Sequence, residues 1–138
     1  ILEIGFGMGI SAGYIQSHSI SSHTIIENHP EIIPLALNWA SDKPNVTIVT
    51  GSWYSNLDNL STYDGIFHDT YGDNDLKSFS SSLDGLTNSG AVVTWWNIFP
   101  TSSNIHNILD VEYQEFEINP PENTYFNHNK YFLPKKQF

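Results

Sequence analysis

The chain has 138 residues, of which 39% are hydrophobic and 14% aromatic, and its formal net charge at pH 7 is −10. It contains five lysines, no arginine and no cysteine, which argues against a basic nucleic-acid-binding stripe and excludes disulfides and thiolate catalysis. No apolar run reaches the roughly 20 residues that a membrane span needs. We predict one globular domain over residues 1–138, without a nucleic-acid or membrane partner and with a cytoplasmic location; the oligomeric state stays open.

The first half of the chain alternates short apolar runs with helix-length segments. We predict strands over residues 1–4, 23–27, 46–50 and 64–69, helices over 8–17 and 30–40, and one or two helical turns over 55–60. The spacing of Ile10, Tyr14 and Ile15 predicts a partial apolar face on the first helix. On the second helix, Ile33, Leu37, Trp39 and Ala40 are predicted to lie on or near the buried side.

The second half of the chain contains fewer helical segments. We predict a helix over 73–86, a turn at 88–90, a strand over 90–96, a short helix over 103–109, and extended segments over 111–118 and 125–133. Alternating strands and helices indicate βαβ units, and the final pair fits an antiparallel addition at a sheet edge. The predicted fold is α/β: a doubly wound, Rossmann-like three-layer sandwich with a mostly parallel seven-stranded sheet and an antiparallel last strand.

Three glycines, Gly5, Gly7 and Gly9, follow the first strand. In this fold, ligands bind at the carboxyl ends of the strands, and glycine lets the backbone turn tightly and approach a ligand. The dinucleotide-binding fingerprint G-x-G-x-x-G requires glycine at position 10, but this residue is Ile10. No P-loop lysine follows, which argues against a nucleoside triphosphate. The G-x-G-x-G spacing favours an S-adenosylmethionine loop; a structural turn without a ligand is the alternative.

Two acidic residues end predicted strands. Glu27 lies 18 positions after Gly9, where an acid binds ribose hydroxyls; an ordinary strand-end acid is the alternative. Asp69 ends the fourth strand, beside the first, and is expected to face the same crevice. After the third strand, Gly51 permits close approach and Ser52 can reach an adenine edge, while Trp53 is either a flat wall or core.

The six histidines indicate no metal site, because no pair has the i, i+4 spacing of helical ligands. His68 alternates with Asp69 and is expected to face the opposite side of the strand, as a packed core residue. We therefore predict no metal.

Six segments resemble the guanidinoacetate N-methyltransferase family, and related arginine N-methyltransferases, in order and spacing. They are LEIGFGMGISA, TIIENHP, VTGSWYSNL, YDGIFHDTYGD, GAVVTWWN and PPENTYFNHNKYFLP. The resemblance implies a class I methyltransferase that uses S-adenosyl-L-methionine to methylate a guanidino group. It also implies an N-terminal lid that this sequence lacks, so the sequence is expected to be a fragment. The segment before the last two strands is shorter than in the animal enzyme, which puts guanidinoacetate itself in question.

The resemblance also implies roles for particular residues. The cofactor would be bound by Gly5, Phe6, Gly7, Met8, Gly9, Ile10, Glu27, Asn28, His29, Gly51, Ser52 and Asp69. The acceptor would be bound by Asp69, Tyr71, Asn97, Ile98 and Phe99.

Asp69 is the expected catalytic residue. A guanidinium is protonated at neutral pH, so Asp69 would pair with it, orient one nitrogen and accept a proton. A methyltransferase for another small amine or a protein side chain is the alternative, with an aromatic pocket from Trp95, Trp96 and Phe99. A cofactor-binding module without activity is a further alternative, and a nicotinamide-dependent oxidoreductase is disfavoured by Ile10.

Overall fold

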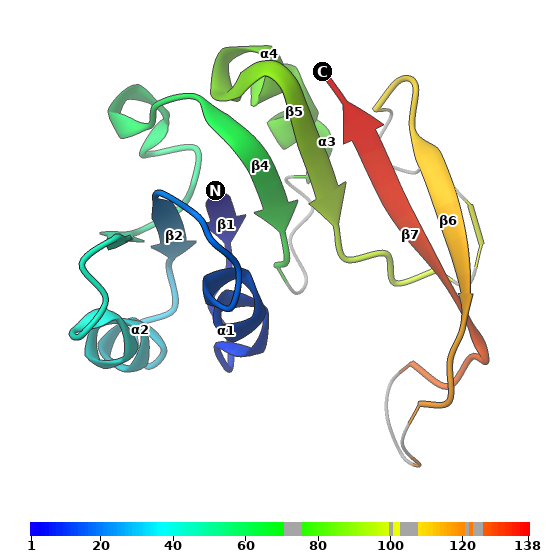
Figure 1. Ribbon diagram of the computed structural model, residues 1–138, viewed down its shortest axis with the longest axis horizontal. Helices are drawn as coiled ribbons and strands as arrows, with labels where there is room; N and C mark the ends of the chain where they lie inside the picture. The colour runs from blue at the N-terminus through cyan, green and yellow to red at the C-terminus, as the bar shows by residue number, and fades with distance from the viewer. Residues whose placement is uncertain (71–75, 100, 103–107, 121, 123–125) are drawn as a thin grey trace.

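The structure is a computed structural model that describes residues 1–70, 76–99, 101–102, 108–120, 122 and 126–138. Seven strands form one sheet in the order β3-β2-β1-β4-β5-β7-β6 (Figure 1). The strands are β1 (Leu2–Ile4), β2 (His23–Glu27), β3 (Val46–Thr50), β4 (Tyr63–His68), β5 (Thr87–Trp95), β6 (Glu112–Glu117) and β7 (Lys130–Gln137). The helices are α1 (Ile10–Gln16), α2 (Ile33–Ala40), α3 (Leu76–Phe79) and α4 (Leu83–Leu86), with 3₁₀ turns η1 (Leu57–Asn59) and η2 (Ser80–Ser82).

The sheet direction confirms the predicted topology. Strands β1 to β5 pair in parallel, whereas β7 runs antiparallel to both of its neighbours, β5 and β6. The chain order reverses beside β1, which has β2 on one side and β4 on the other. In open α/β sheets this switch point is where ligands bind, at the carboxyl ends of the strands.

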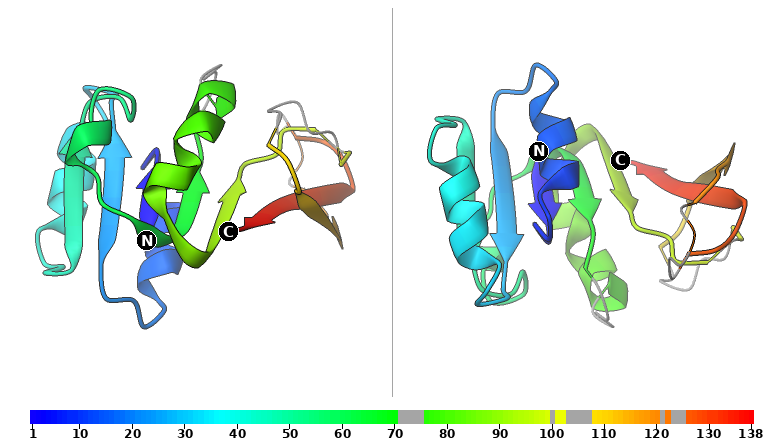
Figure 2. Two further views of the ribbon diagram at one scale, coloured as in Figure 1. Left: turned by 90° about the horizontal axis from the view of Figure 1, so that it is seen from above. Right: turned by 90° about the horizontal axis from the view of Figure 1, so that it is seen from below.

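Helices cover both faces of the sheet, which makes the three predicted layers. In the view from above, α3 and α4 lie in front of the strands, and in the view from below α1 and α2 do (Figure 2). Leu2, Ile66 and Val93 point to the α3–α4 face, where they form the larger core with Phe79 and Trp95. The other face has a smaller core of four buried residues: Phe6, Ala12, Ile25 and Ala36.

The apolar faces predicted for the first two helices are wrong at Ile10, Tyr14 and Leu37. Ile10 and Tyr14 are 63% and 72% exposed, and Ala12 is the buried residue of α1. Leu37 of α2 is 51% exposed, and Ala36 is buried in its place. Trp39, predicted on or near the buried side of α2, does pack against this smaller core.

Helix boundaries also differ from the prediction. Helix α1 starts at Ile10 and not at residue 8, because Gly9 before it has left-handed dihedrals. Helix α2 starts at Ile33, three residues after Pro30. The helix predicted over 73–86 is three short pieces, α3, η2 and α4, and residues 71–75 lie outside the described residues.

The turn predicted at residues 88–90 is a bulge inside β5. Tyr63 pairs with Thr87 but Gly65 pairs with Val92, so β5 carries extra residues between these pairs. Gly90 has a φ of 85° and donates its N–H to Phe138 O at 2.6 Å. The chain therefore stays in the sheet because Phe138, the residue after β7, accepts a hydrogen bond there.

The late segments are only partly described. The strand predicted over 111–118 is confirmed as β6, whereas β7 starts at Lys130, later than predicted. Of the helix predicted over 103–109, residues 103–107 lie outside the described residues, and Ile108 and Leu109 are not helical. Among the described residues, no helix has the length and apolar character to cross a bilayer.

Candidate functional site

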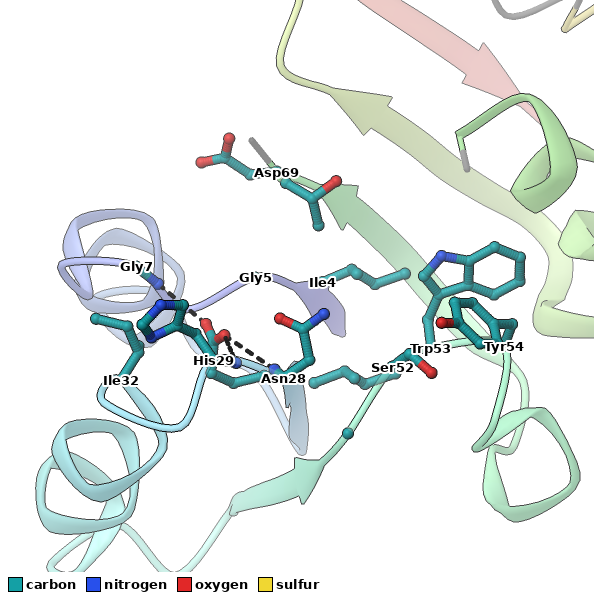
Figure 3. Close-up of a pocket in the computed structure, with 14 residues that line it drawn as sticks. Ile4, Gly5, Gly7, Asn28, His29, Ile32, Ser52, Trp53, Tyr54 and Asp69 are labelled. Carbon is teal, nitrogen blue, oxygen red and sulfur yellow. Dashed lines mark hydrogen bonds between the residues drawn. The ribbon is translucent and has the colours of Figure 1, made fainter. Parts of the chain in front are cut away.

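A cavity of about 570 Å³ opens at the carboxyl ends of β1 to β4 (Figure 3). Its volume lies within the range of small-molecule sites. Fourteen residues line it: Ile4, Gly5, Gly7, Ile26, Glu27, Asn28, His29, Ile32, Gly51, Ser52, Trp53, Tyr54, Asp69 and Thr70. The cavity therefore lies where the strand order reverses, as the fold predicts.

The glycine loop after β1 requires glycine for two physical reasons. Gly5 has a φ of 95°, and a Cβ on it would overlap the carbonyl oxygen of Asp69. Gly7 has a φ of 52°, but a Cβ there would meet no atom within 4 Å. The first glycine thus lets β1 end directly against the end of β4, whereas the second exposes bare backbone to the cavity.

Glu27 ends β2, is 6% exposed, and accepts four backbone N–H groups. Its Oε2 accepts from Phe6 at 2.8 Å and Gly7 at 3.4 Å, and its Oε1 accepts from Asn28 at 2.9 Å and His29 at 2.8 Å. These bonds occupy the roughly four lone-pair sites of a carboxylate. Glu27 therefore holds the glycine loop and the β2–α2 connection together at the cavity wall.

Asp69 follows β4 and lies on the other side of the cavity from Asn28 and Ser52 (Figure 3). Its N–H donates to Ile4 O at 2.8 Å, while its carboxylate forms no hydrogen bond with any described residue. The side chain is exposed, but its surroundings remove part of its hydration. This desolvation, and then the charge of Glu3, raises the pKa of Asp69 above 3.8.

The β3 side of the cavity combines a small-residue turn with aromatic rings. Gly51 has a φ of 106°, and Ser52 Oγ lies 2.8 Å from Ser55 Oγ. Trp53 is 5% exposed, and its Nε1 has no hydrogen-bond partner within the described chain. Its neighbour Tyr54, which the sequence did not single out, is 59% exposed and also lines the cavity. Trp53 is thus both core and cavity wall.

The cavity brings together most of the predicted cofactor residues: Gly5, Gly7, Glu27, Asn28, His29, Gly51, Ser52 and Asp69. Phe6, Met8, Gly9 and Ile10 do not line it. The Phe6 ring packs in the core against Trp39, with ring centroids 5.4 Å apart. Met8 and Ile10 are 89% and 63% exposed, because the left-handed glycines direct the backbone, and not these side chains, toward the cavity.

The predicted acceptor residues after β5 lie outside the cavity lining. Asn97 is 3% exposed and donates through Nδ2 to Thr101 O at 3.1 Å and Phe132 O at 2.9 Å, so its amide joins the end of β5 to β7. Ile98 and Phe99 are 46% and 39% exposed. Tyr71 lies outside the described residues. Of the predicted acceptor residues, Asp69 alone is seen at the cavity within the described chain.

His68 and Glu3 show what alternation along a strand can and cannot reveal. His68 is buried and packs on Phe79 with ring centroids 4.9 Å apart, as predicted for a core histidine. Sequence reasoning missed Glu3, which is 0% exposed in β1 and bonded to Ser11 and His23. An acidic residue within a strand buried on both faces was the available signal, because such a charge needs a partner.

The fold is shared with solved methyltransferases. The precorrin-6y C5,15-methyltransferase of Geobacter metallireducens matches with a TM-score of 0.72 and 18% identity, over 97% of this chain and 76% of that one. Aeropyrum pernix fibrillarin, solved with bound S-adenosyl-L-methionine, matches with a TM-score of 0.73 and 12% identity, over 97% and 64%. The chain therefore has the class I methyltransferase fold, with a glycine-lined cavity at the switch point of its sheet.

The sequence assigns the family within this class. The guanidinoacetate N-methyltransferase family model matches residues 1–116, and the chain belongs to this family. Protein arginine N-methyltransferase 2 of Yarrowia lipolytica is 31% identical over 131 residues, covering 86% of this chain and 28% of that protein. The chain therefore spans little more than a quarter of the length of that relative.

We expect Gly5→Ala to destabilise the fold far more than Gly7→Ala. A Cβ at Gly5 would overlap the Asp69 carbonyl and force β1 and β4 apart. A Cβ at Gly7 would meet no atom, so alanine there costs only the strain of a left-handed backbone, about 1–2 kcal/mol. Urea unfolding of the two variants measures this difference. Equal losses of stability would show that the contact between the strand ends is not required.

We expect Asp69→Asn to gain stability relative to the parent as pH rises. Because the folded pKa of Asp69 is raised above 3.8, its stabilising contribution is present below the unfolded pKa and is lost as pH rises through the folded pKa. The amide does not ionise and escapes this loss. The difference in melting temperature between the two proteins, measured at several pH values above 3.8, tests the sign; a difference that shrinks with rising pH contradicts it.

Proposed function

We propose that this protein is an S-adenosyl-L-methionine-dependent N-methyltransferase that acts on a guanidino group. The observation that carries the proposal is the pair of acids on one cavity: Glu27 at the end of β2 and Asp69 at the end of β4, with the glycine loop between them. Membership of the guanidinoacetate N-methyltransferase family supports the same assignment.

The residues of the cavity fit the proposed cofactor. Gly7 and Gly51 have positive φ and leave backbone uncovered, and the volume of about 570 Å³ suits a small molecule. Glu27 would bind the ribose hydroxyls, which requires a hydroxyl to replace one of its backbone donors. The bond from Gly7 is the longest at 3.4 Å and is the one we expect to be exchanged. Asn28, His29, Gly51 and Ser52 would surround the adenine.

The bound cofactor would supply an activated methyl group on a sulfonium. Asp69 performs the remaining work on the acceptor. Its carboxylate, which has no side-chain partner in the described chain, pairs with the guanidinium and holds one nitrogen toward the cofactor. When this nitrogen takes the methyl group, the methyl–sulfonium bond would break and leave a neutral thioether. Asp69 would accept the proton that the nitrogen loses, and the raised pKa of Asp69 favours that transfer.

The acceptor is proposed at the level of its functional group. The matched family model is that of guanidinoacetate N-methyltransferase, and the Yarrowia relative is named a protein arginine N-methyltransferase. Free guanidinoacetate and an arginine side chain present the same guanidinium to Asp69. The labelled-methyl assay described below also distinguishes two other outcomes: transfer to another amine, and cofactor binding without transfer. The cytoplasmic location stays a prediction from the sequence.

We expect Asp69→Asn to reduce methyl transfer to guanidinoacetate and to an arginine peptide by about 10²–10⁴-fold, with cofactor affinity retained. The amide can still accept a hydrogen bond, but it offers neither the charge nor the proton acceptor. Transfer of a labelled methyl group and calorimetric titration with the cofactor measure the two quantities.

Asp64→Asn is the matched control. Asp64 lies on the same strand, β4, and is exposed, with its Oδ1 accepting from Asn88 Nδ2 at 2.8 Å, outside the cavity lining. This variant is expected to transfer methyl groups at the parental rate. An Asp69→Asn protein as active as the parent would remove Asp69 from the mechanism.

A further inference from the structure

Helix α1 is attached to the sheet with little apolar contact. Ala12 is its buried residue, while Ile10 and Tyr14 are 63% and 72% exposed. A seven-residue helix does not hold its position by intrinsic propensity, since most helical stability in proteins comes from packing of an apolar face. Another interaction has to fix this helix.

A buried polar network attaches both ends of α1 to the sheet. Glu3, fully buried in β1, accepts from Ser11 Oγ through Oε1 at 2.5 Å, and its Oε2 lies 2.8 Å from His23 Nε2 in β2. Gln16 Nε2, in the last turn of α1, lies 3.2 Å from His23 Nδ1. With the His23 proton on Nε2, that nitrogen donates to Glu3 while Nδ1 accepts from the Gln16 amide, so both ring nitrogens of His23 and both carboxylate oxygens of Glu3 have a partner.

Because burying a charge is costly, this network fixes the position of α1 on the sheet. A carboxylate without water is tolerated only when hydrogen-bonded, and Glu3 and His23 are both 0% exposed. A shift of α1 along the sheet would withdraw Ser11 from Glu3 and leave part of a buried charge unpaired. Apolar contacts are non-directional and would allow such a shift, but the network does not.

The glycine loop lies between two members of the network. Glu3 precedes Gly5 by two residues, and Ser11 follows Gly9 by two. Backbone bonds continue the connection, since Gly9 N donates to Phe6 O at 2.8 Å and Gly13 N donates to Gly9 O at 2.9 Å. The position of Ser11 therefore restrains the loop backbone that lines the cavity.

We propose that Glu3, Ser11, His23 and Gln16 form a polar clamp that positions the glycine loop for the cofactor. None of the four lines the cavity, so they are positioning residues. The inference rests on the proposed function for its ligand, but the clamp itself is a property of the free protein. A purely stabilising network is the competing explanation, and it predicts a lower melting temperature without a specific change in cofactor affinity.

The test is Ser11→Ala, with Ser11→Thr as the conservative variant and Ser17→Ala as the matched control. Alanine removes the hydroxyl that donates a hydrogen bond to Glu3. Because alanine also favours helix formation, we expect the fold to survive. Ser17 Oγ caps the other end of the same helix by donating to Tyr14 O at 2.6 Å, and it is exposed. S-adenosylhomocysteine and S-adenosyl-L-methionine are the probes, in calorimetry and in steady-state kinetics.

We expect Ser11→Ala to raise the cofactor Kd and KM about tenfold, because small displacements of positioning groups have large effects, with kcat at saturating cofactor little changed. Threonine restores the affinity, and Ser17→Ala leaves it unchanged. An unchanged Kd in Ser11→Ala, whatever its melting temperature, overturns the proposal.

Hydrogen exchange separates failure of the clamp from failure of the proposed function. Without any ligand, the amides of residues 7–9 are expected to exchange faster in Ser11→Ala than in the parent or in Ser17→Ala. If the parent binds no cofactor, the proposed function fails, and exchange still decides the clamp. Unchanged exchange in the loop overturns it.

Discussion

The burial of carboxylates at one end of a parallel sheet constrains the whole site. Glu3 and Glu27 are 0% and 6% exposed, in a chain with a net charge of −10 and no arginine. No guanidinium is available to pair with them, so each is satisfied by neutral or local donors. Glu27 uses four backbone amides, and Glu3 uses a hydroxyl and an imidazole. The Glu27 bonds connect the loops that follow β1 and β2, and the Glu3 bonds connect α1 to β1 and β2.

Asp69 differs from the two buried acids, and this difference gives the cavity its chemistry. Its carboxylate has no side-chain partner among the described residues, and both desolvation and the charge of Glu3 raise its pKa. A cation that pairs with Asp69 would relieve both penalties. Under the proposed function, the two acids already hydrogen-bonded would hold the backbone in place, and Asp69 would take the guanidinium. Positioning and reactivity would then be divided between different carboxylates.

The sheet, and the strand-end residues that line the cavity, were predictable because their signals are local. Apolar runs such as VTIVT, separated by helix-length segments, indicated the parallel strands, and residues that end or follow those strands, such as Glu27, Gly51 and Asp69, fall at the same edge. The features that escaped prediction depend on contacts between distant segments. Gly90 suits a turn or a bulge equally well, and the pairing with Phe138 decides.

Glu3 and Asn97 show the same limit at the level of side chains. One partner of Glu3, His23, lies 20 residues away on another strand, and the amide of Asn97 donates to Phe132, 35 residues away. A sequence pattern identifies a polar residue near a strand end, but it does not tell whether the protein's own backbone or a ligand occupies it. Ile10 and Tyr14 were misassigned for a related reason, since spacing predicts an apolar face without telling whether a neighbour covers it.

We propose that a methyl donor binds with its nucleoside against Glu27 and its reactive sulfur toward Asp69. A crystal structure of the protein with S-adenosylhomocysteine tests this most directly. We expect the ribose hydroxyls to bind the Glu27 carboxylate in place of the Gly7 amide, the adenine to lie beside Gly51 and Ser52, and the sulfur to face Asp69. A ligand bound elsewhere, with Glu27 still holding all four backbone amides, would contradict it.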